Sequence, residues 1–399
     1  MKNLNPFNLK NFIKTNYFLP YSKQNITGRD IKSVVKALKN DLITQGEILP
    51  RFENEISKKV LSDYSIAVNS ATSALHIACL ALGLKENDYL WTTPITFVAS
   101  ANCGKYCGAK VDFVDIEPNT GLISIKALEE KLKKAKNENK LPKIIVPVHL
   151  CGSSCDMQKI FELSNIYGFS IIEDASHAIG GRYQDFPVGC CKYSDITVFS
   201  FHPVKIITSA EGGVAVTNNH NLAEKMRDLR SHCIIRDPKR FKEKSLGLWK
   251  YEIQELGYNY RMNELQAALG LSQLKRLEKI INRRNYLYDQ YKILLDTLPL
   301  KLLDIPKNVY SSLHLAVITL NDETRRENVF SLFRKNNIGV QLHYYPVHLQ
   351  PIYKKLGFKE GDFPSSEEYS KKAISIPLYP QLKKRDLIRV ANLLKKFLD

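Results

Sequence analysis

Lys205 stands in an uncharged segment behind an apolar, strand-like run at residues 196–201, and is the first candidate for chemistry in this chain. Pro203 stops regular strand pairing just before it. A lysine among apolar neighbours loses hydration, which favours the neutral amine, and a neutral amine can condense with an aldehyde to form a Schiff base. The alternative is a loop lysine whose charged end reaches water.

Two further segments offer groups that a flat, phosphorylated ligand would need. Residues 70–73 (Ser-Ala-Thr-Ser) begin a helical pattern after a short apolar run, and the free N–H groups of a helix start attract a phosphate. The same residues could instead form an ordinary helix cap. Phe97 follows another strand-like run, and its flat face could stack on a planar ring, although core packing is the default for a single phenylalanine.

Asp174 ends the apolar run of residues 169–174, and His177 follows three residues later. A carboxylate at this place could pair with a ring nitrogen and keep it protonated, which lets a pyridine ring accept electrons, or it could cap the next turn. His177 could orient Asp174, contact a ring hydroxyl or be an ordinary buried histidine. These weak signals gain weight from their common position at strand ends.

Strand and helix patterns alternate over most of the chain before residue 262, which predicts an α/β fold with a mostly parallel sheet covered on both faces. Ligands gather at the carboxyl ends of the strands in such a sheet. A long helical pattern at residues 263–298 and an α+β pattern beyond it, with an extended run at residues 339–345, indicate a smaller domain. The predicted strands lie at residues 65–69, 89–93, 110–116, 143–149, 169–174, 195–200 and 213–217.

The composition, with 44% hydrophobic and 25% charged residues, is that of a globular enzyme of 399 residues. A net charge of +17 could indicate nucleic acid or an anionic membrane, but no nucleic-acid module or membrane-spanning run is recognisable. A positive field would favour the approach of a phosphorylated substrate. We predict an N-terminal extension (1–18), a large domain (19–262), and a long helix with a small C-terminal domain (263–399).

The eight cysteines show neither a secretory disulfide framework nor a complete set of metal ligands. The pairs Cys103/Cys107 and Cys151/Cys155 have a spacing that could hold a metal on a helix, but no matching histidine set accompanies them. No signal peptide is recognisable, so we expect reduced cysteines, a cytoplasmic location and no metal ion.

The order of a phosphate-type helix start, an aromatic residue, a strand-end aspartate and a strand-end lysine resembles that of fold-type I pyridoxal phosphate (PLP) enzymes. From about residue 19 to the C-terminus, the chain is similar to the nucleotide-sugar aminotransferases of the DegT/DnrJ/EryC1/StrS family. The segments that carry this resemblance are residues 19–24, 42–46, 69–75, 93–100, 173–178, 199–205, 211–213, 257–268 and 343–351.

The resemblance implies a role for each candidate. Lys205 would hold the cofactor as a Schiff base, Asp174 would pair with the pyridine nitrogen, and Phe97 would lie against the ring. His177 would lie at the ring hydroxyl. The other implied residues are the phosphate ligands Ala71, Thr72, Ser200 and, from the neighbouring subunit of a homodimer with shared sites, Asn259, and the sugar-nucleotide contacts Tyr21, His343 and Tyr344.

The implied reaction is a ping-pong transfer of the amino group of L-glutamate, through an internal aldimine on Lys205, to a keto-sugar. Residues 69–75 and 209–213 are most similar to the branch that aminates C4 of a UDP-linked 4-keto-6-deoxy-N-acetyl-hexosamine in pseudaminic acid biosynthesis. The alternatives are amination at C3, a dTDP- or GDP-linked substrate, a sugar dehydratase, which the presence of Lys205 disfavours, and a non-catalytic regulator or binding module.

Overall fold

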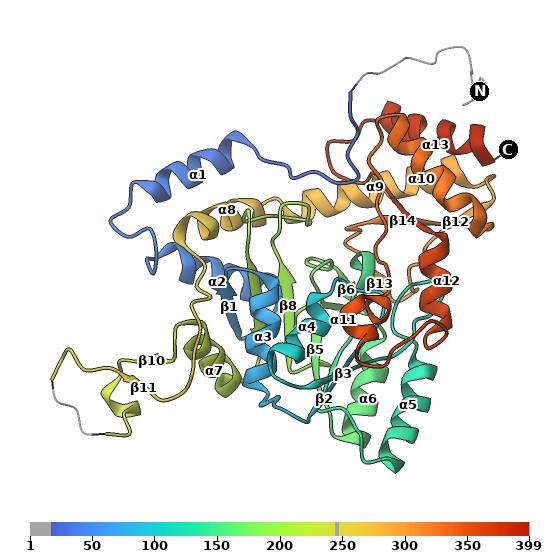
Figure 1. The fold of residues 1–399 in the computed structure, drawn as a ribbon. Coiled ribbons are helices and arrows are strands. Elements are labelled where there is room, and N and C mark those ends of the chain that lie inside the picture. Colours follow the sequence, from blue (N-terminus) through green and yellow to red (C-terminus); the bar gives the residue numbers. More distant parts are fainter. Residues whose placement is uncertain (1–16, 244–246, 399) are drawn as a thin grey trace.

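The computed structural model describes residues 17–243 and 247–398 around a seven-stranded sheet (Figure 1). Its strands are β1 Tyr64–Val68, β2 Tyr89–Thr92, β3 Lys110–Phe113, β4 Ile144–Val146, β5 Ser170–Asp174, β8 Ile196–Ser200 and β9 Gly213–Thr217. The spatial order is β1-β9-β8-β5-β4-β2-β3. The strands from β3 to β8 in this order pair in parallel, and β9 is antiparallel to both of its neighbours. The predicted mostly parallel α/β sheet is confirmed.

Helices cover both faces of the sheet. They are α2 Ile48–Val60, α3 Ala71–Ala81, α4 Ala99–Tyr106, α5 Ile125–Asn137, α6 Met157–Tyr167, α7 His220–Arg230 and α8 Glu264–Leu274. Successive strand residues point to opposite faces, so Ile66 and Val198 pack in the cluster that includes α3, α4 and α7. Their neighbours Ala67 and Phe199 pack with α2 and α8 on the other face. This double burial explains the nearly continuous apolar strands of the sequence.

Helix α1 (Gly28–Leu38) lies along α8 (Figure 1). The buried carboxylate of Asp30 accepts a hydrogen bond from the Thr27 backbone N–H (2.7 Å), and the two residues form a capping box at the start of α1. The same carboxylate accepts from the Ser272 hydroxyl (2.6 Å) and pairs with Arg276 (2.7 Å). One acid therefore begins α1 and also attaches it to the end of α8.

Two predictions about the C-terminal part of the chain are wrong. The helix predicted over residues 263–298 is two helices, α8 and α9 (Leu277–Leu295), because Arg276 leaves helical geometry (φ −109°, ψ 5°) where its side chain binds Asp30. Residues 339–345 do not form a strand, and Gln341 makes only an isolated bridge with Ser375. The segment instead carries His343 toward the site described below.

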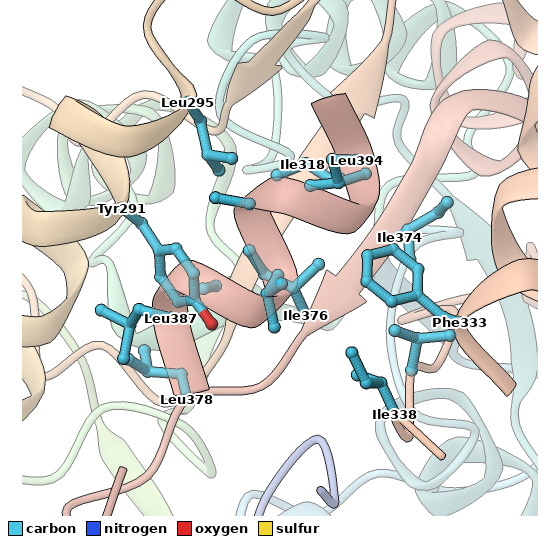
Figure 2. Close-up of a cluster of buried hydrophobic side chains, with 14 of the residues drawn as sticks. Tyr291, Leu295, Ile318, Phe333, Ile338, Ile374, Ile376, Leu378, Leu387 and Leu394 are labelled. Atoms are coloured by element: carbon cyan, nitrogen blue, oxygen red, sulfur yellow. The ribbon is translucent and has the colours of Figure 1, made fainter. Parts of the chain in front are cut away.

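Most C-terminal elements surround a second hydrophobic core. They are α9, α10 Arg326–Lys335, α13 Lys384–Leu398 and a sheet of β12 Leu300–Leu302, β14 Ala316–Leu320 and β15 Ala373–Ile376. Helices α11 Pro351–Lys354 and α12 Pro364–Lys372 instead bury residues in clusters shared with β3 and β2 of the large sheet. Figure 2 shows Tyr291, Phe333 and Leu387 around Ile376 in this core. The Tyr291 hydroxyl donates to the Pro377 carbonyl (2.9 Å), which satisfies its buried polar atom. A domain boundary at residue 262 stays a prediction.

Short strands complete the fold. They are β6 Arg182–Tyr183, β7 Phe186–Pro187 and β13 Val309–Tyr310 in one small sheet, and β10 Ile234–Ile235 and β11 Glu252–Ile253 in another. Within residues 17–243 and 247–398, no helix combines the length and the apolar content that crossing a membrane requires. Residues 1–16 of the predicted N-terminal extension lie outside the described residues.

Candidate active site

Lys205 lies in the connection between β8 and β9. Backbone hydrogen bonds within this connection hold its shape. The Phe201 N–H donates to the Gly212 carbonyl (2.9 Å), and the Lys205 N–H donates to the His202 carbonyl (3.0 Å). Burial lowers the pKa of the Lys205 amine to about 8, although the charge of Asp174 opposes this shift. At this pKa, a considerable fraction of the amine is neutral just below pH 8, as a nucleophile requires.

The buried carboxylate of Asp174 ends β5 and is held by two donors. The Ser100 hydroxyl donates to Oδ2 (2.5 Å), and the Ser176 backbone N–H donates to Oδ1 (3.1 Å). Sequence reasoning missed Ser100. Ser100 lies in the first turn of α4, and its hydroxyl is 2.7 Å from that of Thr96, which precedes the helix. The local spacing carries no signal of the contact with Asp174, which is 74 residues away in the sequence. The carboxylate is therefore fixed in place and close enough to Lys205 to act on its pKa.

Glu173 precedes Asp174 on β5, and strand alternation turns it to the opposite face of the sheet. It is buried among polar partners: Nε2 of His149 is 2.7 Å from its carboxylate, the Thr197 hydroxyl donates to it (2.9 Å), and so does the Ser194 hydroxyl. Burial alone would raise the pKa of Glu173, but these hydrogen bonds outweigh burial and lower it. Adjacent acids thus have separate surroundings.

The start of α3 adjoins the end of β8. Ser70 caps α3 by accepting a hydrogen bond from a backbone N–H of its first turn (3.1 Å). Ser200 pairs with Gly213 in the sheet, and a Cβ on Gly213 would lie 2.5 Å from the backbone nitrogen of Ala71. Ala71, Thr72 and Ser200 therefore lie on adjoining segments, with the positive end of a helix dipole beside a hydroxyl.

Aromatic side chains surround the space near Lys205. The Tyr344 hydroxyl is 3.2 Å from Nε2 of His177, and the Phe97 ring centroid is 6.3 Å from that of Tyr344. Phe97 is 57% exposed, which leaves ring surface for a planar ligand. Burial lowers the pKa of His177 far below its usual value, and the charge of Lys205 adds to this effect. Its Nδ1 is buried without a hydrogen-bond partner in the described part of the chain.

Tyr21 and His343 lie side by side, with ring centroids 5.3 Å apart. Nδ1 of His343 is 2.7 Å from the Ser375 hydroxyl, and burial, aided by the charge of Lys205, lowers the pKa of His343 to about 3. The residue after Tyr21, Ser22, donates to the backbone carbonyl of Val204 (3.0 Å). Segments from both ends of the chain therefore meet at the connection that carries the lysine.

Asn259 has a different setting in this chain. It forms an isolated backbone bridge with Ser231, and its side chain is exposed. The neighbouring Tyr260 carbonyl accepts a hydrogen bond from the Asn69 N–H (2.8 Å). A contribution of Asn259 to the site of a neighbouring subunit stays a prediction.

Sequence reasoning also missed two buried basic residues, Arg284 and His314. The Arg284 guanidinium donates to the carbonyls of His314 (3.1 Å) and Leu378 (2.9 Å), and it is 1% exposed. The His314 ring centroid is 4.4 Å from that of His177. An arginine in a charged amphipathic helix carries no sequence signal of such burial.

The residues present fit PLP. A lysine amine of lowered pKa is available for an aldehyde, Asp174 for a ring nitrogen, and the start of α3 for a phosphate. The unpartnered Nδ1 of His177 and the exposed face of Phe97 suit a ring that carries a hydroxyl. Fold and site together define the class of PLP-dependent enzymes.

Comparison with known proteins gives the family. Residues 24–395 match the DegT/DnrJ/EryC1/StrS aminotransferase family, and the chain belongs to it. A UDP-4-amino-4,6-dideoxy-N-acetyl-beta-L-altrosamine transaminase of Campylobacter jejuni is 38% identical over 96% of this chain and 98% of its own length. The match spans nearly the whole of both chains.

Two solved structures have the same fold. Helicobacter pylori PseC, an aminotransferase involved in the biosynthesis of pseudoaminic acid, matches with a TM-score of 0.86 and 31% identity over 96% of this chain and 99% of its own. The PLP form of a Streptococcus pneumoniae protein named as a sugar aminotransferase matches with a TM-score of 0.85 and 26% identity over 96% and 100% of the two chains. The present chain is thus a PLP-dependent sugar aminotransferase.

Proposed function

We propose that this enzyme moves the amino group of L-glutamate to C4 of a UDP-linked 4-keto-6-deoxy-N-acetyl-hexosamine. The observation that supports this substrate is the 38% identity, over 96% of this chain, to the Campylobacter jejuni transaminase. The placement of Tyr21, His343 and Tyr344 around the Lys205 connection supports a substrate site at this place.

When bound, PLP supplies an electron sink for the negative charge that forms as a proton leaves the donor's Cα. Lys205 would hold the aldehyde carbon and, once its amine is released, move that proton between carbon atoms. Asp174, kept in place by Ser100, would hold the ring nitrogen protonated. The start of α3 with Ser200 would bind the phosphate, and Phe97 would cover a ring face.

We also propose a homodimer with shared sites. The exposed side of α1 carries Ile31, Val35 and Leu38, which are 58%, 46% and 55% exposed. An apolar groove of about 380 Å³ between α1 and the Lys205 connection, lined in part by Val34 and Pro203, adjoins this face. A second copy of the chain that covers α1 would therefore approach the catalytic lysine, as the predicted role of Asn259 requires.

The test is a product analysis with purified protein, PLP, glutamate and a panel of UDP- and dTDP-linked 4-keto and 3-keto sugars. Mass spectrometry and NMR of the products should show a 4-amino group on the UDP-linked N-acetyl-hexosamine. The Lys205→Ala variant should form no product and lack the yellow colour of the wild type, whereas Lys126→Ala, at an exposed lysine, should match the wild type.

Amination of only a dTDP-linked sugar, or at C3, would refute the proposed substrate. A wild-type protein that takes up PLP but leaves glutamate unchanged would support the alternative of a non-catalytic binding module.

A further inference from the structure

A buried hydrogen-bond network lies on the face of the sheet that is opposite to the candidate active site. Its centre is His149, which follows the end of β4 and is 0% exposed. Nε2 of His149 is 2.7 Å from the carboxylate of Glu173, and the Cys155 backbone N–H donates to Nδ1 (3.2 Å). The two hydroxyls that also donate to Glu173 come from β8 and the segment before it. The network therefore connects β5 with the strand on each side of it.

The geometry decides which ring nitrogen of His149 carries a hydrogen. Because Nδ1 accepts from a backbone N–H, the ring hydrogen lies on Nε2 and points to Glu173. Burial acts against a positive charge on this ring, whereas its neighbours Cys155 and Glu173 raise the pKa of His149. A second ring hydrogen would nevertheless meet the Cys155 N–H, so His149 donates to Glu173 as a neutral ring.

Backbone hydrogen bonds between the ends of β4 and β5 join this network to Asp174. The His149 N–H donates to the Asp174 carbonyl (3.0 Å), and the Asp174 N–H donates to the Pro147 carbonyl (2.9 Å). Val148 and Asp174 form the bridge between these two bonds. The side-chain bond from His149 to Glu173 spans the same two strand ends one residue away. It therefore fixes the position of the strand end from which the Asp174 side chain extends to the other face.

The residue types His149, Glu173 and Cys155 could form a nucleophilic triad, but their arrangement excludes this chemistry. The Cys155 thiol donates to the Val148 carbonyl (3.2 Å), and Cys155 is 0% exposed. The backbone N–H of Cys155, and not its thiol, occupies the near nitrogen of the ring. No group of three or more His, Cys, Asp or Glu side chains in residues 17–243 and 247–398 is arranged to hold a metal ion. The network therefore acts through its hydrogen bonds.

We propose that His149 and Glu173 are positioning residues of the reaction, which act through Asp174. Their hydrogen bond holds the end of β5 against the end of β4 and so places the Asp174 carboxylate opposite the ring nitrogen of PLP. This inference rests on the proposed role of Asp174. The Ser100 hydroxyl and the Ser176 N–H orient the carboxylate itself, whereas His149 and Glu173 place the backbone that carries it.

The experiment compares the binding of two cofactor analogues to the cofactor-free protein. One is deoxypyridoxine phosphate, which lacks the aldehyde and so forms no bond to Lys205. The other is the same compound with a CH group in place of the ring nitrogen. The wild type should bind the first at least ~10-fold more tightly, because only a ring nitrogen can form a charge-assisted hydrogen bond with Asp174. Isothermal titration calorimetry measures both affinities, and their ratio is the nitrogen preference.

Two amide variants isolate the bond between His149 and Glu173. In His149→Asn, the short side chain keeps an acceptor for the Cys155 N–H but does not reach Glu173, and the nitrogen preference should fall to ~3-fold or less. In His149→Gln, the amide N–H reaches Glu173 and should keep most of the preference. Glu173→Met has a similar volume, breaks the same bond from its other end and should behave as His149→Asn does.

His348 provides a matched control. It is also 0% exposed, and its Nε2 is 3.0 Å from the carboxylate of Glu367, but this pair joins the segment after Tyr344 to α12. His348→Asn should lower the stability to urea as His149→Asn does, yet it should leave the nitrogen preference unchanged.

Asp174→Asn separates this inference from the role on which it rests. Asp174→Asn should abolish the nitrogen preference, and a preference that persists in it would refute the proposed role of Asp174. If Asp174→Asn loses the preference, a full preference in His149→Asn or an equal loss in His348→Asn would overturn the positioning role alone. Circular dichroism verifies that each variant is folded, and Glu173→Met decides the outcome if His149→Asn is not.

Discussion

Around Lys205, the histidines are neutral at physiological pH, because burial lowers the pKa of His177, His314 and His343. The positive charge of Lys205 contributes to each of these shifts. The lysine therefore titrates beside Asp174 and uncharged imidazoles. A histidine would not produce a titration step near pH 6.5 at this site, and the pH dependence should belong to the lysine.

We therefore expect the PLP uptake of the cofactor-free protein to accelerate with rising pH, with a half-maximal rate near pH 8, the pKa of Lys205. Absorbance at the wavelength of the lysine-bound cofactor measures the rate. Because the folded pKa lies below the usual 10.5, the fold disfavours protonated Lys205, and this cost in stability is complete below pH 8 and disappears toward pH 10.5. A midpoint near pH 6.5 or above 10 would contradict the assignment.

Ser100 is a positioning residue for Asp174 rather than a group that contacts substrate. Ser100→Ala removes the hydrogen bond to Oδ2. We expect the rate of the glutamate half-reaction to fall by about 10- to 100-fold, since a hydrogen bond to a charged group contributes about 1.5–3 kcal/mol. Ser100→Thr should restore most of the rate because it keeps the hydroxyl. Stopped-flow absorbance measures the step, and an unchanged rate in Ser100→Ala would exclude this role.

At the scale of elements, the contact between β9 and the start of α3 has no room for a side chain. Gly213→Ala would place Cβ 2.5 Å from the Ala71 nitrogen, so we expect the free energy of unfolding to fall by ~1–3 kcal/mol and the affinity for PLP to decrease. Gly28→Ala is the control, since no atom lies within 4 Å of the position that its methyl group would take. Urea unfolding measures the first effect and equilibrium PLP titration the second. An unaltered PLP affinity would show that this contact does not support the phosphate site.

The core of the C-terminal elements depends on a few large side chains (Figure 2). Leu387 is 1% exposed in α13, and Leu387→Ala should lower the free energy of unfolding by ~2–5 kcal/mol, because it leaves a cavity. Ile166→Ala in α6, at 66% exposure, should change it by no more than about 0.5 kcal/mol. Urea unfolding followed by circular dichroism compares them; equal effects would mean that the α13 core contributes little to stability.

The sequence predicted those elements whose signal is local. Buried strands such as β5, β8 and β9 are short apolar runs, and their bounds agree within a residue or so. The break at Arg276 has no glycine or proline, because it depends on the distant Asp30. Leu313 has a φ of 51°, and its carbonyl accepts from Arg284. Likewise, the hydroxyl that donates to the Asp174 carboxylate belongs to Ser100, which is 74 residues away in the sequence. Such long-range contacts leave no periodic pattern.

For the whole molecule, shared sites make a specific prediction about mixed dimers. Lys205→Ala and Asn259→Asp should each be nearly inactive alone. If Asn259 acts on the partner's cofactor, each mixed dimer has one intact site, and random mixing should restore about a quarter of wild-type activity. The measurement is the transamination rate after the variants are mixed, unfolded and refolded together. No recovery would show that Lys205 and Asn259 of one and the same chain act in one site, which would contradict shared sites.

Glu173 and Asp174 are neighbours in the sequence, and this has a consequence for how the sequence of β5 can change in this family. The two acids point to opposite faces of β5, one into a buried network with His149 and the other toward Lys205. A strand has a side-chain period of two, so the gain or loss of a single residue within β5 would exchange the two faces. Each face of the sheet would still receive one carboxylate, but Glu173 would then face Lys205 and Asp174 would face His149. Length variation during evolution should therefore be confined to the loops around β5, and substitution should be the only tolerated change within it.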